Sequence, residues 1–288
     1  MTKKLFYDIL YKDIIVNLLI EGKKWRTKVK TYIENFKKYR FLLYELVKKG
    51  IKLKYRRSYL GILWTLLEPL LTMIVLTVVF GAMFGNPDPT FPVYVLTGRL
   101  LYSFFSSATS AAMRAIRANS GMIKKVYVPK YIYPLSSVLF NYITFLLSLL
   151  VLVAVAIVLK VYPTIYLIQA LIPLILLLIT AFGVGMILST LAVFFRDLEY
   201  LWSVVLMLIM YASAIFYPAE RLLNKPGIYP YILKCNPLYL LIHNFRQAVY
   251  GQPLNTHFLI ASVAFAVSSV IVGLVFFYKR QDEFILHI

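Results

Sequence analysis

The sequence predicts an all-α integral membrane protein with six transmembrane helices, an N-terminal amphipathic interfacial helix and a re-entrant helical pair between the fifth and sixth spans. Of its 288 residues, 61% are hydrophobic and only 15% are charged, and the mean hydropathy is +0.76. A soluble domain is about 45–50% apolar and about 25% charged, so a soluble fold could not bury this much apolar surface. The long apolar runs do not alternate as barrel strands do, which favours helices.

Positive charge is concentrated before the first long apolar run. The chain has 31 Lys and Arg and 12 Asp and Glu, for a net charge of +19. Residues 1–59 hold 17 of the basic and five of the acidic residues, which is +12 of that total. We expect this charge to lie beside an anionic inner leaflet. Nucleic-acid binding is not expected, because the sequence shows neither a basic face on a soluble core nor an aromatic RNA-binding motif.

Two segments precede the predicted six-span domain at residues 61–288. Residues 1–38 are expected to form a basic cytoplasmic extension, in which Leu5–Ile20 has helical periodicity but carries three charges and no cleavage site follows it. Residues 39–60 are predicted to form the interfacial helix, which lies in the headgroup plane and anchors the chain or also docks a partner. Its apolar and basic faces consist of Tyr44, Val47, Ile51 and Tyr55 on one side and Lys48, Lys52 and Arg56 on the other.

A spanning helix needs about 20 mostly apolar residues. Six segments qualify, of which the fifth is short and the fourth contains Pro173 and is expected to start as a broken or tilted segment: Gly61–Phe84, Phe91–Met113, Pro134–Leu159, Ile165–Phe195, Leu201–Tyr217 and Thr256–Tyr278. The loop Arg114–Lys130 has five basic residues and the loop Gly85–Thr90 has none. The positive-inside rule therefore predicts a cytoplasmic-membrane protein with both termini inside.

Residues 218–255 are assigned to the outer side, although they carry several basic residues. The segment contains five prolines, and its two helical pieces, Tyr229–Leu233 and Pro237–Tyr250, are too short to span. We expect them to dip into the membrane from outside as a re-entrant pair. Irregular backbone at that depth is tolerated only where protein or a water-filled cavity surrounds it, so this segment is a candidate for lining a pathway.

The sequence carries no recognisable catalytic or metal-binding motif. It has no G-x-x-x-x-G-K-[ST] phosphate loop, and Gly183-Val184-Gly185 lies inside an apolar helix, where small residues favour close helix packing. Three scattered histidines and the single Cys235 cannot form a metal set or an intrachain disulfide. We therefore expect a protein that is not itself an enzyme and binds no cofactor or metal.

Few polar residues interrupt the predicted spans, and such residues are functional candidates: Glu68, Arg99, Asn141 and Gln169. Glu68 would lie about 10 Å from the inner surface and Arg99 about 12 Å from the outer one, so their levels differ by about 8 Å in a core of about 30 Å. A long Arg side chain could nearly bridge that difference. One hypothesis is that the two residues pair, and the other is that Arg99 snorkels or faces a water-filled conduit.

Aromatic residues make up 16% of the chain, and several lie within the predicted spans rather than at their ends. These residues are Tyr94, Tyr102, Phe104, Phe105, Trp202, Tyr211, Phe216 and Tyr217. Flat rings with a hydroxyl group suit the apolar faces and hydroxyls of sugars. The alternative is that they serve the lipid interface and helix packing.

Five short runs occur in a consistent order along residues 40–280. They are Leu53–Trp64 followed by Glu68-Pro69-Leu70, Leu96-Thr97-Gly98 with Phe104-Phe105, Ile123–Lys130, Phe194–Leu198, and Asn236–Tyr239 with Phe245-Arg246. In this order they resemble the ABC-2-type permeases that export polysaccharides, O-antigens and teichoic acids. Arg99 departs from the family pattern, which has an uncharged residue there, and residues 1–38 lie outside it.

The resemblance implies a permease that is embedded in membrane lipid and forms a homodimer. It also implies a separate pair of ATPase subunits, which bind ATP and Mg. It implies that the first cytoplasmic loop and the end of the fourth span couple the permease to the movement of the ATPase subunits. The candidate coupling residues are Ser120, Ile123, Lys124, Lys125, Tyr127, Lys130, Arg196 and Asp197. It also implies that the re-entrant pair forms an outer gate. The candidate conduit and gate residues are Arg99, Tyr102, Phe105, Tyr211, Phe216, Tyr217, Pro237 and Tyr239.

The expected function is the permease subunit of an ATP-driven exporter of a lipid-linked cell-surface polysaccharide. Arg56 and Arg57 are the candidate ligands for the phosphate of the lipid carrier, because Arg binds phosphate well. Four alternatives remain: a teichoic acid exporter, a drug or small-lipid exporter, a membrane-embedded transferase, and a channel or structural protein. A transferase would need a pair of acidic residues. Asp197 and Glu199 are close enough in sequence, but they are better explained as residues of a loop that is ion-paired with the adjacent Arg196.

Overall fold

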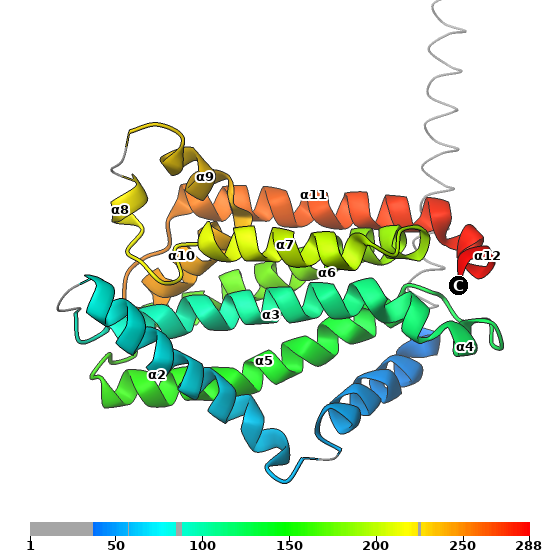
Figure 1. Cartoon of the computed structure of the whole chain (residues 1–288), viewed down its shortest axis with the longest axis horizontal. Coiled ribbons are helices and arrows are strands. Elements are labelled where there is room, and N and C mark those ends of the chain that lie inside the picture. Colours follow the sequence, from blue (N-terminus) through cyan, green and yellow to red (C-terminus); the bar gives the residue numbers. More distant parts are fainter. Residues whose placement is uncertain (1–36, 57, 85–87, 224–225) are drawn as a thin grey trace, which may run out of the picture. The chain divides into compact units, whose positions relative to one another are not determined.

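The computed structural model describes residues 37–56, 58–84, 88–223 and 226–288 (Figure 1). Within these ranges all regular secondary structure is helical and there is no strand, which confirms the all-helical class. The chain divides into two compact units, Met1–Glu45 and Leu46–Ile288. In the first, residues 37–45 are helical, and in the second, residues 46–55 are helical. The helix predicted at Leu5–Ile20 lies outside the described residues.

The second unit contains the long helices. They are α2 (Trp64–Phe84), α3 (Phe91–Ala118), α5 (Ile132–Val158), α6 (Leu171–Phe194), α7 (Leu198–Tyr211) and α11 (Thr256–Arg280). Four helical segments are long and apolar enough to cross a membrane: Gly61–Ala82, Ile132–Val158, Ile165–Phe194 and Thr256–His287. The predicted second and fifth spans are not among these, because α3 carries arginines and many hydroxyl groups and α7 has only 14 residues.

Short helices connect or extend the long ones. They are η1 (Gly61–Leu63), α4 (Ser120–Ile123), η2 (Ile165–Ala170), α8 (Glu220–Leu223), α9 (Tyr229–Cys235), α10 (Pro237–Val249), η3 (Gln281–Glu283) and α12 (Phe284–His287). The predicted fourth span does begin irregularly, as the 3-10 helix η2. Pro173 lies in the first turn of α6, where its missing N–H is not needed. The two short pieces predicted between residues 229 and 250 correspond to α9 and α10.

Helix α6 lies at the centre of the second unit and packs against α3, α5, α10 and α11. Two glycines permit this close packing. A Cβ atom added at Gly183 would lie 2.4 Å from Ser269 Oγ of α11, and one added at Gly185 would lie 2.8 Å from Ala112 Cβ of α3. Both distances are far below van der Waals contact, so the prediction of close packing through the Gly183–Gly185 run is confirmed. The two glycines serve two different neighbours of α6.

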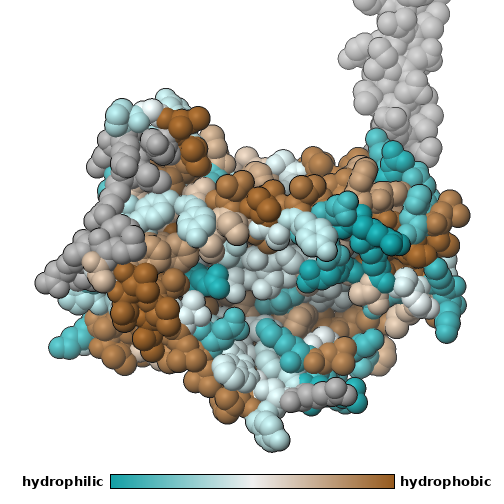
Figure 2. All heavy atoms as spheres, in the orientation of Figure 1, coloured by the Kyte–Doolittle hydropathy of each residue, from teal (hydrophilic) through white to brown (hydrophobic). Residues whose placement is uncertain are grey.

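Apolar side chains also cover the outside of the helices. Val78 of α2, Leu208 of α7 and Ile271 of α11 are each more than half exposed. Figure 2 shows hydrophobic residues along the visible surface of α2 and α11. A water-soluble protein rarely exposes continuous apolar surface of this extent, whereas a lipid environment accommodates it.

Candidate functional site

The side chain of Arg246 in α10 donates four hydrogen bonds to residues outside its own helix. It is 6% exposed, and its Cζ atom lies over the ring of Tyr94, 3.4 Å from the ring centroid. Nη1 donates to the Ala214 carbonyl at 2.9 Å, and Nη2 donates to the Tyr94 carbonyl at 2.9 Å and the Ile215 carbonyl at 3.4 Å. Nε donates to Thr97 Oγ1 at 3.3 Å. One buried cation therefore joins α10, α3 and the segment that follows α7.

The backbone around this arginine is shaped to receive it. Ala214 adopts a left-handed conformation with φ of 48°, which is unusual for a residue with a side chain. Its carbonyl accepts hydrogen bonds from Arg246 and, at 3.0 Å, from the Tyr94 hydroxyl. A Cβ atom added at Gly98 would lie 2.6 Å from Arg246 Nη2. The absence of a side chain at Gly98 thus makes room for the guanidinium.

Asn236 secures the other end of α10. Its Oδ1 atom accepts from the backbone N–H of Leu238 at 3.0 Å, which caps the first turn of the helix. Its Nδ2 atom donates to the Ala212 carbonyl at 3.0 Å and to Ser213 Oγ at 2.9 Å. Two runs that the sequence analysis treated separately, Leu96–Gly98 and Asn236–Arg246, therefore meet at one junction. We call this arrangement of α3, α10 and residues 212–217 the α3–α10 junction.

Most of the predicted conduit and gate residues are in helix contacts within this chain. The Tyr102 hydroxyl donates to the Leu206 carbonyl of α7 at 3.0 Å, and Phe105 packs against Trp202 of the same helix. Phe216 stacks on Phe80 of α2 with ring centroids 5.1 Å apart.

The remaining members of this set differ in exposure. Tyr239 is buried against Phe258, and its hydroxyl has no hydrogen-bond partner among the residues that the structure describes. Pro237 lines an apolar cavity below α9, and the Tyr217 hydroxyl donates to the Tyr211 carbonyl. The Tyr211 side chain itself is 57% exposed. A role of these residues in a conduit stays a prediction.

The loop between α3 and α5 has an exposed part and a buried part. Lys124, Lys125 and Tyr127 are exposed, Tyr127 by 95%. Ile123 is buried in a cluster that also contains Phe284 of α12. Only the exposed part is accessible for contact with another molecule.

Lys130 connects the same loop to the C-terminal segment. Its Nζ atom donates to the Gln281 carbonyl and lies 5.8 Å from the centroid of the Phe284 ring. Burial lowers the pKa of Lys130, while the nearby charge of Asp282 raises it. No motif in the last eight residues of the sequence indicates this connection.

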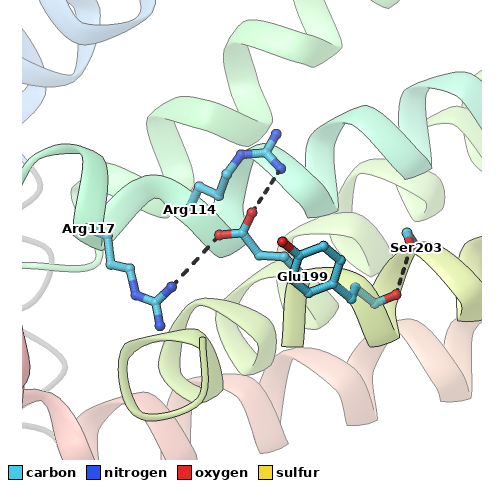
Figure 3. A network of polar contacts seen from close by, with 5 residues as sticks. Arg114, Arg117, Glu199 and Ser203 are labelled. Carbon is cyan, nitrogen blue, oxygen red and sulfur yellow. Dashed lines mark hydrogen bonds and ion pairs between the residues drawn. The ribbon is translucent and has the colours of Figure 1, made fainter. Parts of the chain in front are cut away.

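A charge cluster joins the ends of α3 and α7 near this loop (Figure 3). Glu199 Oε2 lies 3.8 Å from Arg114 Nη1, and Glu199 Oε1 lies 3.8 Å from Arg117 Nη1. The predicted pairing of the acidic loop with Arg196 is wrong in its partner, because the first turn of α7 directs Glu199 toward α3. Arg196 and Asp197 are both exposed at the start of α7. With Glu199 engaged by two arginines, Asp197 and Glu199 do not form the free acid pair that a transferase would need.

A polar cavity of about 70 Å³ lies between α2, α3 and α5. Both Glu68 and Arg99 line it, although no ion pair within 4 Å joins them or involves either of them in the described part of the chain. The hypothesis of direct pairing is therefore not supported, and the two charges instead face a shared space.

Of the two predicted phosphate ligands, the structure describes one. Arg56 is exposed in the turn after the helical residues 46–55, and Arg57 lies outside the described residues. In the described ranges no group of three or more His, Cys, Asp or Glu could hold a metal ion.

Comparison with known proteins gives a consistent family assignment. A family model described as "ABC-2 type transporter" matches residues 42–250. The O-antigen export system permease protein RfbA of Klebsiella pneumoniae is 31% identical over 245 residues, which cover 84% of this chain and 93% of that protein. RfbA of Myxococcus xanthus is 30% identical over 249 residues (85% and 95%), and the polysialic acid transport protein KpsM of Escherichia coli is 26% identical over 245 residues (81% and 91%). The chain therefore belongs to the ABC-2 type transporter family.

Proposed function

We propose that the chain is the membrane-spanning permease subunit of an ATP-driven exporter of a lipid-linked cell-surface polysaccharide. The observation that carries this proposal is the similarity, over more than four-fifths of the chain, to permeases named for the export of O-antigen and polysialic acid. The sequence has no phosphate loop, so ATP and Mg would bind to a separate ATPase subunit. Two copies of the permease would form one conduit.

The proposed topology has six spans, with α3 and α7 crossing in addition to the four long apolar segments. Helix α3 has 28 residues and is about 42 Å long, which exceeds a hydrocarbon core of about 30 Å. Its last turns, with Arg114 and Arg117, would stand in the inner headgroup region. Helix α7 is about 21 Å long, and residues 212–217, of which 213–216 are buried, would complete its crossing. Both termini would then be cytoplasmic, with α9 and α10 re-entering from outside.

The exposed Lys124, Lys125 and Tyr127 are the proposed docking surface for the ATPase, with Arg196 and Asp197 beside it. Movement of this loop would reach α3 directly, and it would reach α7 through the cluster of Arg114, Arg117 and Glu199 (Figure 3). At its other end, α7 joins the α3–α10 junction. Closure of the ATPase pair would thus tilt α3 and α7 together and separate the two permease subunits enough to pass the glycan.

The predicted conduit residues would either guide the cargo or hold the helices around it. Tyr211 presents its ring outside the bundle, and Tyr102, Phe105, Phe216, Tyr217 and Tyr239 hold the surrounding helices. Pro237, at the first position of α10, would let the gate helix begin sharply. Arg56 and Arg57 would attract the phosphate of the lipid carrier at the inner surface.

Export can be tested in cells from which the gene has been deleted. Complementation with the wild-type gene should restore surface polysaccharide, measured with a glycan-specific antibody on intact cells. The double variant Lys124→Glu/Lys125→Glu should leave the glycan inside the cell at normal permease levels. The matched control is Lys160→Glu/Lys234→Glu, which reverses the same number of exposed charges at the proposed outer ends. Unchanged surface glycan in the deletion strain would contradict the proposal.

A further inference from the structure

The cavity between α2, α3 and α5 is charged, although it lies within helices long enough to span a membrane. Its charged residues are Lys54, Glu68 and Arg99. Hydroxyl and amide groups supply most of the remaining polar lining: Thr65, Thr72, Ser103, Ser107, Asn141, Thr144 and Ser148. Lys54 and Glu68 are exposed, and Arg99 is partly buried. An ionisable group in a membrane-spanning segment is costly unless it pairs, meets water or binds a ligand.

The charges in the cavity are not neutralised by one another. The contact that the Arg99 guanidinium makes within the described chain is with the Tyr102 ring, 5.8 Å from its centroid. Neither Arg99 nor Glu68 forms an ion pair with another described residue. Two positive charges and one negative charge leave the cavity with a net charge of +1. A ligand with one negative charge would balance it.

Hydrogen-bond donors on α3 are arranged for an anion. Arg99, Ser103 and Ser107 are spaced four residues apart, so they lie along one face of the helix. The hydroxyls of Thr72, Thr144 and Ser148 already donate to carbonyls of their own helices, at 2.7, 3.0 and 2.7 Å. The hydroxyls of Ser103 and Ser107 have no such acceptor in the described chain, so they are available to donate.

We propose that this cavity binds the phosphate group of a membrane lipid, with Arg99 and Lys54 as cationic ligands and Ser103 and Ser107 as hydroxyl donors. Arg recognises phosphate through paired, charge-assisted hydrogen bonds. A cavity of about 70 Å³ has room for several water molecules or one phosphate-sized group. With Glu68 the net charge of the cavity is +1, which balances one negative charge of a phosphodiester or of a phosphate monoester. The phosphate belongs either to a bulk phospholipid or, if the proposed function holds, to the lipid carrier of the cargo.

The test is lipid binding to the full-length permease purified in detergent, followed by native mass spectrometry. The probes are dioctanoyl phosphatidylglycerol, a short-chain polyprenyl phosphate, and dioctanoylglycerol, which lacks phosphate. Both phosphate probes should bind and dioctanoylglycerol should not. Arg99→Gln should weaken phosphate binding about 10-fold or more, because a charge-assisted contact is lost. Glu68→Gln should strengthen it, because a repulsive charge is removed.

Two further variants keep the test decisive. Arg280→Gln removes an exposed arginine outside the cavity and should bind as the wild type does. Ser103→Ala/Ser107→Ala is a mild change that should still weaken binding, even if Arg99→Gln folds poorly. Equal binding by wild type, Arg99→Gln and the serine variant, or equal binding of dioctanoylglycerol, would overturn the proposal.

The source of the phosphate follows from the two probes and from export. Preference for polyprenyl phosphate, together with lost export in Arg99→Gln, would assign the site to the cargo carrier. Equal binding of both probes with normal export would assign it to a structural phospholipid. The binding measurement needs neither the ATPase nor export, so its failure is distinct from failure of the proposed function.

Discussion

Replacement of Arg246 by Gln should destabilise the bundle more than any change of a single surface charge. The variant removes donors from three backbone carbonyls and the Thr97 hydroxyl, all inside the protein. Hydrogen bonds from a charged donor are worth about 1.5–3 kcal/mol each. The Ala214 and Tyr94 carbonyls keep the Tyr94 and Thr97 hydroxyls as donors, and release of the buried cation from its desolvation penalty also offsets part of the loss. We expect a net loss of about 3–5 kcal/mol, which corresponds to a fall in Tm of roughly 10 °C.

The assay is thermal unfolding of the detergent-purified protein, followed by tryptophan fluorescence and by size-exclusion chromatography after heating. Arg246→Lys should recover only part of the stability, because one ammonium cannot reproduce a planar set of donors. Arg280→Gln is the control, since its exposed pair with Glu283 is worth at most about 1 kcal/mol. A Tm for Arg246→Gln within 2 °C of the control would refute the reasoning.

A double-mutant cycle with Gly98→Ala locates the effect at the α3–α10 junction. The new methyl group would lie 2.6 Å from Arg246 Nη2, so the guanidinium must move and lose hydrogen bonds. In the wild-type background the cost should be about 1–3 kcal/mol. In the Arg246→Gln background it should fall to less than half of that value. Additive effects of the two substitutions would mean that the arginine is not held as described.

Three other positions give independent predictions. Gly183→Ala should lower Tm by several degrees, because its methyl group would lie within 2.6 Å of α11, whereas Gly121→Ala, which meets open space, should change it little. Phe284→Ala should cost about 3–5 kcal/mol in thermal unfolding and release the α3–α5 loop, while Leu286→Ala, at an 83% exposed position, should not. Asp88 accepts two hydrogen bonds that lower its pKa, so its contribution to stability should be present above about pH 4 and lost as pH falls through the lowered value. Asp88→Asn should remove this acid-side decline when Tm is measured between pH 5 and 3.

Periodicity and composition were sufficient to predict the long helices, whose apolar side chains a lipid environment accommodates. Helices α5 and α11, and α6 taken together with η2, begin and end close to the predicted bounds, because long apolar runs are stable only as helices in a membrane. The short helices α9 and α10 were also expected, since prolines limit each of them. The close packing at Gly183 followed from small residues in an apolar helix.

Long-range polar contacts could not be derived from the sequence. Arg246 is one of two arginines in the segment assigned to the outer side, and its acceptors come from α3 and from the turn that follows α7. Glu199 was paired with its sequence neighbour, whereas its partners lie more than 80 residues earlier. Lys130 contacts the Gln281 carbonyl and the Phe284 ring, more than 150 residues later, instead of lying on an exposed docking surface. In each case the partner is set by how helices pack, which periodicity does not specify.

The most direct test of the proposed ATP-driven export is purification of the tagged permease from its native membranes, followed by mass spectrometry and an ATPase assay. The account predicts a stoichiometric nucleotide-binding protein and ATP turnover in the eluate. Both should be lost in Lys124→Glu/Lys125→Glu and retained in Lys160→Glu/Lys234→Glu. A pure permease with no nucleotide-binding partner and no ATP turnover would contradict the account, and the family relationship would then describe the fold alone.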